Sequence, residues 1–114
     1  MAEIPDVMEA AKNVVKLKLE NNRARVLETR IRPGKKAPMH NHPHNHVVYF
    51  MANARLKLTF PDGKSDKLNV KAGQTIWMQP GSHETENVGK TVAHYLVVEL
   101  KATPEKAASL SDSS

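Results

Sequence analysis

The sequence predicts an all-β domain in which short antiparallel strands form a sandwich or a barrel. Apolar and charged residues alternate in several segments, most clearly in 14–20 (VVKLKLE) and 55–60 (RLKLTF), which is the period of a strand with one buried face. Turn residues such as Asn-Asn, Pro-Gly and Pro-Asp-Gly separate these segments about every eight to twelve residues. A sandwich or barrel is the economical way to bury so many short strands.

The chain is predicted to begin with one short helix and to continue in about nine strands. Residues 5–11 open with Pro-Asp, which suits a helix start, and Val7, Met8 and Ala11 would then share an apolar face. In the second strand the alternation slips at Val26-Leu27, which predicts a bulge or burial on both faces. The expected strands are 14–20, 23–32, 37–42, 46–52, 55–60, 65–70, 75–79, 82–88 and 91–100.

At 114 residues the chain has the length of one domain. We expect an N-terminal segment with the helix over 1–13, the barrel over 14–102 and a flexible polar tail over 103–114. The chain has no cysteine, which excludes disulfides and thiolate metal ligands. We find neither a signal peptide nor an apolar run of roughly 20 residues, and therefore expect a soluble, cytoplasmic protein with no membrane partner.

Basic residues outnumber acidic ones, which gives a net charge of +5 and an isoelectric point near 9.6. Many stand two apart, as Lys16 with Lys18 and Arg55 with Lys57, which is the spacing of a solvated strand face. They are spread along the chain with few aromatic residues, whereas RNA-binding sheets place stacking aromatic residues beside their basic ones. We therefore expect no nucleic-acid partner.

Most of the histidines lie in one run, residues 40–46 (HNHPHNH). Neutral imidazole is a common ligand of transition metals. On a strand, His40 and His42 leave the same face with Cα atoms roughly 6.6 Å apart, close enough for both rings to bind one ion. Pro43 interrupts the strand and favours a turn, which would bring His46 back beside them and leave His44 at the tip, toward solvent. The run therefore predicts three metal ligands, not four.

An alternative is a surface histidine tract that binds metal adventitiously. The run leads directly into 46–52 (HVVYFMA), the most apolar predicted strand, so at least part of it is expected to face inward. No Ser-His-Asp arrangement, phosphate-binding glycine loop or paired-carboxylate motif stands out in the sequence. Metal binding is therefore the only chemistry that the sequence indicates.

Two stretches of the chain resemble the two signatures of the cupin superfamily. The first follows the family's Gly, His, His, Glu, Gly spacing at Gly34, His40, His42, His46 and Asn53. The second runs from Gly73 through Pro80-Gly81 to His83 and Asn87. The resemblance covers about residues 23–100 and implies a double-stranded β-helix, which is a jelly-roll barrel, with one metal ion inside. It adds His83 to His40, His42 and His46 as a metal ligand.

The resemblance is incomplete at three points. His46 stands where the family has a glutamate ligand, Asn53 replaces a glycine, and the second signature is one residue shorter. Four neutral imidazoles leave the charge of a divalent ion uncompensated, which favours an anionic or chelating ligand in the open positions. Glu84 and Glu86 alternate to the face opposite His83 and do not restore the carboxylate. The expected cofactor is one divalent transition metal ion: Zn, Ni, Fe, Cu, Co or Mn.

Three residues outside the histidine run are candidate substrate contacts. Tyr49 and Trp77 could wall a pocket, although a single aromatic residue in a β protein usually packs. Asn87 shares the strand face of His83 and could orient a ligand.

His94 is the fourth candidate. We interpret Glu99 and Lys101 as outward-facing, which places His94 inside the barrel. There it could contact substrate or transfer a proton, or it could be a hydrogen-bonded residue of the core.

The function predicted from the sequence is that of a metal-binding cupin that binds or converts a small anionic or chelating metabolite. In its enzyme form, dioxygenase- or isomerase-type chemistry is expected by resemblance. The alternative is a binding or sensing module without turnover, and a third reading is a structural β domain with a surface histidine tract. We also expect a homodimer by resemblance, with Val26-Leu27 as a candidate contact.

Overall fold

The computed structural model describes residues 3–101, which form one helix and nine strands. The helix is α1 (Val7–Ala10). The strands are β1 (Val15–Glu20), β2 (Ala24–Ile31), β3 (Lys36–His42), β4 (His46–Phe50), β5 (Ala54–Thr59), β6 (Ser65–Val70), β7 (Thr75–Met78), β8 (Gly81–Asn87) and β9 (Ala93–Leu100). The all-β prediction and the expected order of elements are confirmed, and the tail predicted for 103–114 lies outside the described residues.

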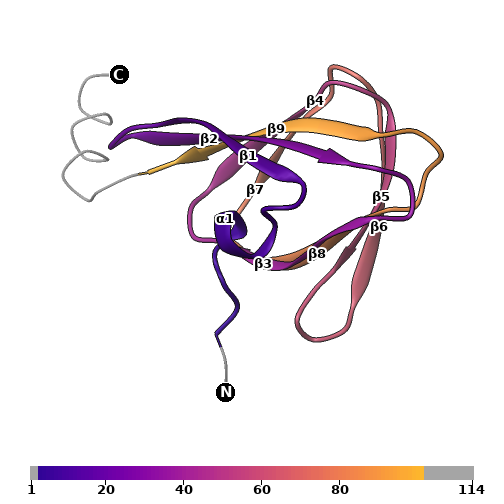
Figure 1. The fold of residues 1–114 in the computed structure, drawn as a ribbon, viewed down its shortest axis with the longest axis horizontal. Coiled ribbons are helices and arrows are strands. Elements are labelled where there is room, and N and C mark those ends of the chain that lie inside the picture. The colour runs from indigo at the N-terminus through magenta and orange to yellow at the C-terminus, as the bar shows by residue number, and fades with distance from the viewer. Residues whose placement is uncertain (1–2, 102–114) are drawn as a thin grey trace.

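Two antiparallel sheets face each other and enclose the core (Figure 1). One has five strands in the order β1-β2-β9-β4-β7, and the other has four in the order β3-β8-β5-β6. From β2 onward the chain passes repeatedly from one sheet to the other, and only the β5-β6 hairpin stays within one sheet. This winding is the double-stranded β-helix that the sequence resemblance implies.

Helix α1 lies between β3 and β1, the edge strands of the two sheets (Figure 1). Asp6 caps the helix by accepting a hydrogen bond from the Met8 amide at 2.9 Å. Val7 and Ala11 are buried in the core, as the apolar face of residues 5–11 predicts. The N-terminal segment is therefore packed into the barrel rather than appended to it. No helix within residues 3–101 has the length and apolar character that a membrane span requires.

The irregularity predicted at Val26-Leu27 lies on the neighbouring strand instead. Strand β2 pairs with β9 without interruption, and the register with β1 shifts between Leu17 and Leu19, so that Lys18 is the extra residue. Leu27 faces the core and Val26 faces outward, as simple alternation requires.

The register predicted for β9 is wrong. Ala93, Tyr95, Val97 and Glu99 are the residues of β9 that are buried. His94 therefore lies on the outer face, where its Nε2 is 2.7 Å from the carboxylate of Glu28. The prediction assumed that a charged residue marks the outward face, but Glu99 is charged and fully buried because other side chains pair with it inside the barrel.

Candidate metal centre

Four histidines from three strands converge inside the barrel. His40 and His42 stand two apart on β3, and β8 places His83 directly opposite His40 in the sheet. His46 begins β4 in the facing sheet, because the chain turns between His42 and His46. All four side chains are buried. The turn that the sequence predicts at Pro43 is thus present, and the four predicted ligands are brought together.

Three of the rings are arranged to share one ion. His40, His42 and His83 each offer a ring nitrogen, and these atoms all lie within 4.8 Å of one another. The ring centroid of His40 is 4.9 Å from that of His42 and 4.8 Å from that of His83. Imidazoles at such spacing can close onto one ion at about 2.0–2.1 Å with small rotations of their rings. These three buried histidines could therefore hold a metal ion.

His46 lies beside this group rather than within it. Its ring stacks on His42 with a centroid separation of 4.4 Å. Its Nε2 is buried and has no hydrogen-bond partner, which is true of no other buried side-chain nitrogen or oxygen in residues 3–101. A buried polar atom without a partner is costly, by roughly 1–3 kcal/mol. A metal ion at this position would satisfy that nitrogen.

Hydrogen bonds from the protein orient three of the four rings. The Nδ1 atom lies 2.6 Å from the Pro38 carbonyl oxygen in His40, and 2.9 Å from that of His44 in His46. In His42 it lies 2.9 Å from Oε2 of Glu99. Carbonyl and carboxylate oxygens only accept, so in each neutral ring Nδ1 carries the proton and Nε2 keeps its lone pair. That tautomer is the one in which Nε2 binds a metal.

Burial keeps His40, His46 and His83 neutral. Together with a smaller effect of the neighbouring histidines, it lowers the pKa of His40 to about 4 and that of His83 to about 3. Burial also lowers the pKa of His46, although its hydrogen bond to the His44 carbonyl opposes the shift. A metal therefore does not have to displace protons from these three rings at neutral pH.

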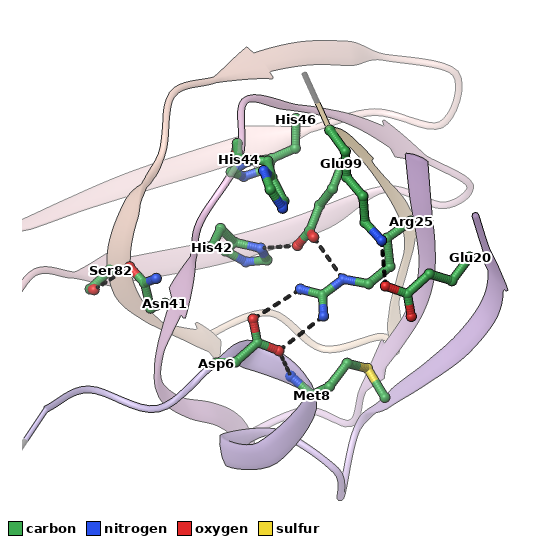
Figure 2. Close-up of polar contacts among 11 residues, drawn as sticks. Asp6, Met8, Glu20, Arg25, Asn41, His42, His44, His46, Ser82 and Glu99 are labelled. Atoms are coloured by element: carbon green, nitrogen blue, oxygen red, sulfur yellow. Dashed lines mark hydrogen bonds and ion pairs between the residues drawn. The ribbon is translucent and has the colours of Figure 1, made fainter. Parts of the chain in front are cut away.

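A chain of charged residues extends behind His42, and sequence reasoning missed it (Figure 2). The buried carboxylate of Glu99 accepts from His42 and, at 2.7 Å, from Nε of Arg25. The two terminal nitrogens of Arg25 donate to the carboxylate of Asp6 at 3.1 and 3.0 Å. Burial acts to raise the pKa of Glu99, but the hydrogen bonds from His42 and Arg25 outweigh it and lower the pKa to about 2. Glu99 is thus a carboxylate at any physiological pH.

The histidines face a small apolar cavity of about 30 Å³, which has room for about two water molecules. Its wall is mostly aliphatic and aromatic and includes Phe50 and Val7 of the N-terminal helix. Tyr95 adds a hydroxyl that is hydrogen-bonded to Thr85 and Thr29. Burial raises the pKa of Tyr95 to about 12, so this hydroxyl stays protonated.

The structure does not bring the predicted substrate contacts to this cavity. Tyr49 and Trp77 lie on the outer face of the five-stranded sheet and are 43% and 57% exposed. His94 is on the same outer face, paired with Glu28 as described above. Asn87 is buried, but its amide nitrogen donates to the Ile31 and Thr91 carbonyls, so it closes the neighbouring loops. His44 is half-buried rather than fully solvent-exposed.

No protein-family model and no curated protein matches the sequence. Among solved structures, the chain is similar to a cupin domain from Bordetella pertussis Tohama I, at 26% identity and a TM-score of 0.73, over 90% of this chain and 100% of that one. It is also similar to an RmlC-like cupin family protein with a double-stranded β-helix fold from Methanocaldococcus jannaschii, at 17% identity and a TM-score of 0.64, over 83% and 84% of the two chains.

The fold is a cupin fold. A third similar structure is that of an oxalate decarboxylase, with 22% identity and a TM-score of 0.59, which covers 75% of this chain and 25% of the decarboxylase chain. At this identity the similarity concerns the fold alone. Some proteins with this architecture are therefore enzymes, but the fold does not determine the chemistry, which depends on the residues of the site.

The donor set of the histidine cluster fits a transition metal ion. Neutral imidazole nitrogens suit such ions better than Mg²⁺ or Ca²⁺, which prefer oxygen. Glu84 and Glu86 lie on the outer face of β8, as predicted, and Lys36 pairs with Glu84 at 3.4 Å. The carboxylate nearest the histidines is instead Glu99, which reaches the site through the ring of His42.

Proposed function

We propose that this cupin binds one divalent transition metal ion through His40, His42 and His83, with His46 as a fourth ligand. The buried, unpaired Nε2 of His46 is the observation that carries the proposal. Its ring stacks on that of His42 with centroids 4.4 Å apart, and the ring nitrogens of His42, His40 and His83 are already within 4.8 Å of one another. The ion is of the group Zn, Ni, Fe, Cu, Co or Mn.

We further propose that the bound ligand is small and anionic or chelating. Imidazole binds a metal in its neutral form, so the ion would keep most of its charge, which attracts an anion. The aliphatic cavity wall has a low dielectric and strengthens that attraction. A cavity of about 30 Å³ admits only a few non-hydrogen atoms unless the barrel opens.

The bound ion would polarise an oxygen-bearing ligand or activate dioxygen. The chain's own contribution is to hold the rings by their Nδ1 hydrogen bonds and to exclude water with the apolar wall. Apart from the histidines, Tyr95 is the only titratable residue among those that line the cavity, and its high pKa keeps it a hydrogen-bond donor rather than a base. General acid–base chemistry therefore has little support, which favours metal-centred chemistry or binding alone.

Two readings of the site follow from this. One is a metal-dependent enzyme of dioxygenase or isomerase type, and the other is a binding or sensing module without turnover. Because few residues that line the cavity can act as acid or base, the site favours a binding module or metal-centred oxygen chemistry over isomerisation by proton transfer.

Metal analysis tests the proposal directly. The protein is expressed with each of the six metals in turn, dialysed, and analysed for bound metal by inductively coupled plasma mass spectrometry. About one ion per chain is expected for at least one metal, and none for any metal would refute the proposal. The loaded protein is then screened against small carboxylates and chelating oxygen compounds, with and without dioxygen, to distinguish turnover from binding.

We also propose that two copies of the chain pair through the outer face of the five-stranded sheet. The strand registers align one apolar side chain from each strand in a single row: Leu19, Val26, Val98, Val47 and Trp77. The row crosses the sheet over about 19 Å, and Trp77 and Leu19 are more than half exposed. A row of apolar side chains on an outer sheet face, exposed at both ends, suits an interaction surface.

A second copy is the occupant that fits this row. The adjacent row carries opposite charges on Lys16 and Glu28. A second copy of the chain, turned by a two-fold axis, can therefore place its Glu28 near Lys16 of the first and its Lys16 near Glu28 of the first. The chain beyond Lys101 is a poor alternative, because residues 102–114 contain one large apolar residue, Leu110.

A further inference from the structure

The Asp6–Arg25–Glu99–His42 chain joins the N-terminal segment to the candidate metal centre (Figure 2). Its members come from four different elements, since Asp6 caps α1 and the other three lie on β2, β9 and β3. Every link is a charge-assisted hydrogen bond of 2.7–3.1 Å. Such a chain can fasten the segment to the barrel, and it can also act on the metal ligand at its end.

We propose that Asp6 and Arg25 are positioning residues of the metal centre, so that docking of residues 5–11 and metal binding strengthen each other. This inference rests on the metal site of the proposed function.

The first argument is orientation. Glu99 is fully buried, and only a carboxylate held in place can fix the ring of His42. Arg25 holds it through Nε, while both terminal nitrogens of the same guanidinium are fixed by Asp6. Without Asp6 the Arg25 guanidinium keeps only one of these three hydrogen bonds, the one from Nε to Glu99, and is free to rotate about it. The position of Glu99, and with it the ring of His42, then becomes less defined.

The second argument is charge. Asp6, Arg25 and Glu99 have formal charges of −1, +1 and −1, so the group retains one net negative charge beside the histidine cluster. Arg25 alone would cancel the charge of Glu99, and Asp6 restores it. The group thereby offsets part of the charge of a bound divalent ion, which the glutamate of the first cupin signature would otherwise offset.

The third argument is a backbone contact that does not involve the ion pairs. The Asn41 amide donates to the Pro5 carbonyl oxygen at 2.8 Å, and Asp6 and Asn41 form a parallel bridge. Asn41 lies between His40 and His42 on β3. The docked segment therefore holds the backbone at the point from which both ligands project.

Coupling of this kind must act in both directions. If docking of the segment raises metal affinity, then metal binding must stabilise docking by the same factor. Hydrogen exchange detects the second effect at the amides of Met8 and Asn41, whose acceptors, Asp6 and Pro5, belong to the segment. A purely structural role for the ion pairs would leave the effect of metal on these exchange rates the same with and without the charge of Asp6.

Asp6→Asn is the decisive variant, and Asp62→Asn is its control. Asn is as good a helix cap as Asp, so D6N keeps the hydrogen bond to Met8 while it removes the charge and one acceptor for Arg25. Asp62 accepts from the Lys64 amide in an exposed hairpin turn, so D62N removes an equal charge away from the site. Affinity is measured by titrating Co²⁺ and Zn²⁺ in competition with a chromophoric chelator, and the visible spectrum of bound Co²⁺ reports ligand geometry.

We expect the wild type to bind the metal and D6N to bind it about fivefold more weakly with an altered Co²⁺ spectrum, while D62N stays within about twofold. Metal should also slow exchange at Met8 and Asn41 in the wild type and do so less in D6N. Equal affinity in D6N and wild type, with metal slowing exchange equally in both, would overturn the inference and leave the proposed function standing. A wild type that binds no metal overturns both. If D6N does not fold by circular dichroism, Arg25→Lys replaces it, since lysine keeps the charge and lacks the fork.

Discussion

Nδ1 of His42 and Oε2 of Glu99 lie 2.9 Å apart in the closed interior, although the two residues are 57 positions apart in the sequence. The pair is a carboxylate–histidine contact of the kind that orients metal ligands in other proteins. Glu99 supplies its negative charge through the His42 ring, whereas the glutamate of the first cupin signature would bind the metal directly. The contact makes Glu99 as much a part of the site as the rings.

Glu99→Gln should lower metal affinity by about 10- to 100-fold, the range for changes behind a metal-binding histidine. The amide keeps the shape but removes the charge that favours the protonated Nδ1 of His42. Chelator competition measures the loss. Glu84→Gln is the matched control, because Glu84 pairs with Lys36 on the outer face of β8 and its replacement should leave affinity unchanged. Equal losses in both variants would mean that overall charge, not the contact with His42, sets affinity.

His83→Ala should release the metal. His83 has no sequence neighbour in the histidine run, and its place opposite His40 is what completes the group of three. Loss of a ligand should weaken binding by more than about 100-fold, since even changes behind a ligand weaken it by about 10- to 100-fold. His44→Ala and His94→Ala are the controls and should retain the metal. A His83→Ala protein that keeps the ion while His44→Ala loses it would reverse the assignment made from the turn at Pro43.

Much of the fold was predictable because it depends on patterns among residues that are close in the sequence. Alternation with a period of two located the strands, and turn residues separated them. His40 and His42 were predictable as a pair because strand geometry alone puts them on one face. His46 joined them because Pro43 predicts a reversal, and His83 followed from the resemblance to the second cupin signature.

The rest of the site could not be read from local patterns. Both faces of β9 are apolar, with Leu96 and Val98 on one and Tyr95 and Val97 on the other, so Glu99 and Lys101 decided the predicted register. A buried carboxylate and a solvated one look the same in sequence when the partners lie far along the chain, as Arg25 does at 74 residues. The same limit applies to Tyr49 and Trp77, whose aromatic character suits a pocket wall as well as an outer face.

The metal-free protein should lose stability as the pH falls below about 6.5. His40 and His83 have pKa values of about 4 and 3 in the folded protein, against 6.5 when unfolded. The unfolded chain therefore takes up protons first, so this stability is complete above pH 6.5 and is lost as the pH falls toward 4 and 3. Between pH 7 and pH 5 the loss should amount to a few kcal/mol, since each of the two rings contributes on the order of 1 kcal/mol for each pH unit below 6.5.

Urea unfolding of the metal-free protein at pH 7 and pH 5 measures this difference. Glu99 does not contribute in this window, because its pKa of about 2 lies below its ordinary value of 4.5 and its share is lost only between those values. Saturating Zn²⁺ should reduce the loss between pH 7 and pH 5, since the bound rings cannot take up protons. A free energy of unfolding that is the same at both pH values would show that the rings are not buried as neutral groups.

Trp77→Lys should convert the proposed dimer to a monomer. Trp77 ends the apolar row on the outer sheet face, and a lysine there would bring a buried charge into the interface of each copy. Light scattering coupled to gel filtration should give twice the chain mass, about 25 kDa, for wild type and 12.7 kDa for the variant.

Val88→Lys is the matched control for that variant. Val88 is 45% exposed but follows β8 in the opposite sheet, so the added charge should leave the mass unchanged. Because Trp77 is the single tryptophan of the chain, its fluorescence gives an independent measure. The emission should shift to longer wavelength on dilution as the ring returns to water. A wild type that is monomeric at every concentration, with emission typical of exposed tryptophan, would refute the proposed dimer.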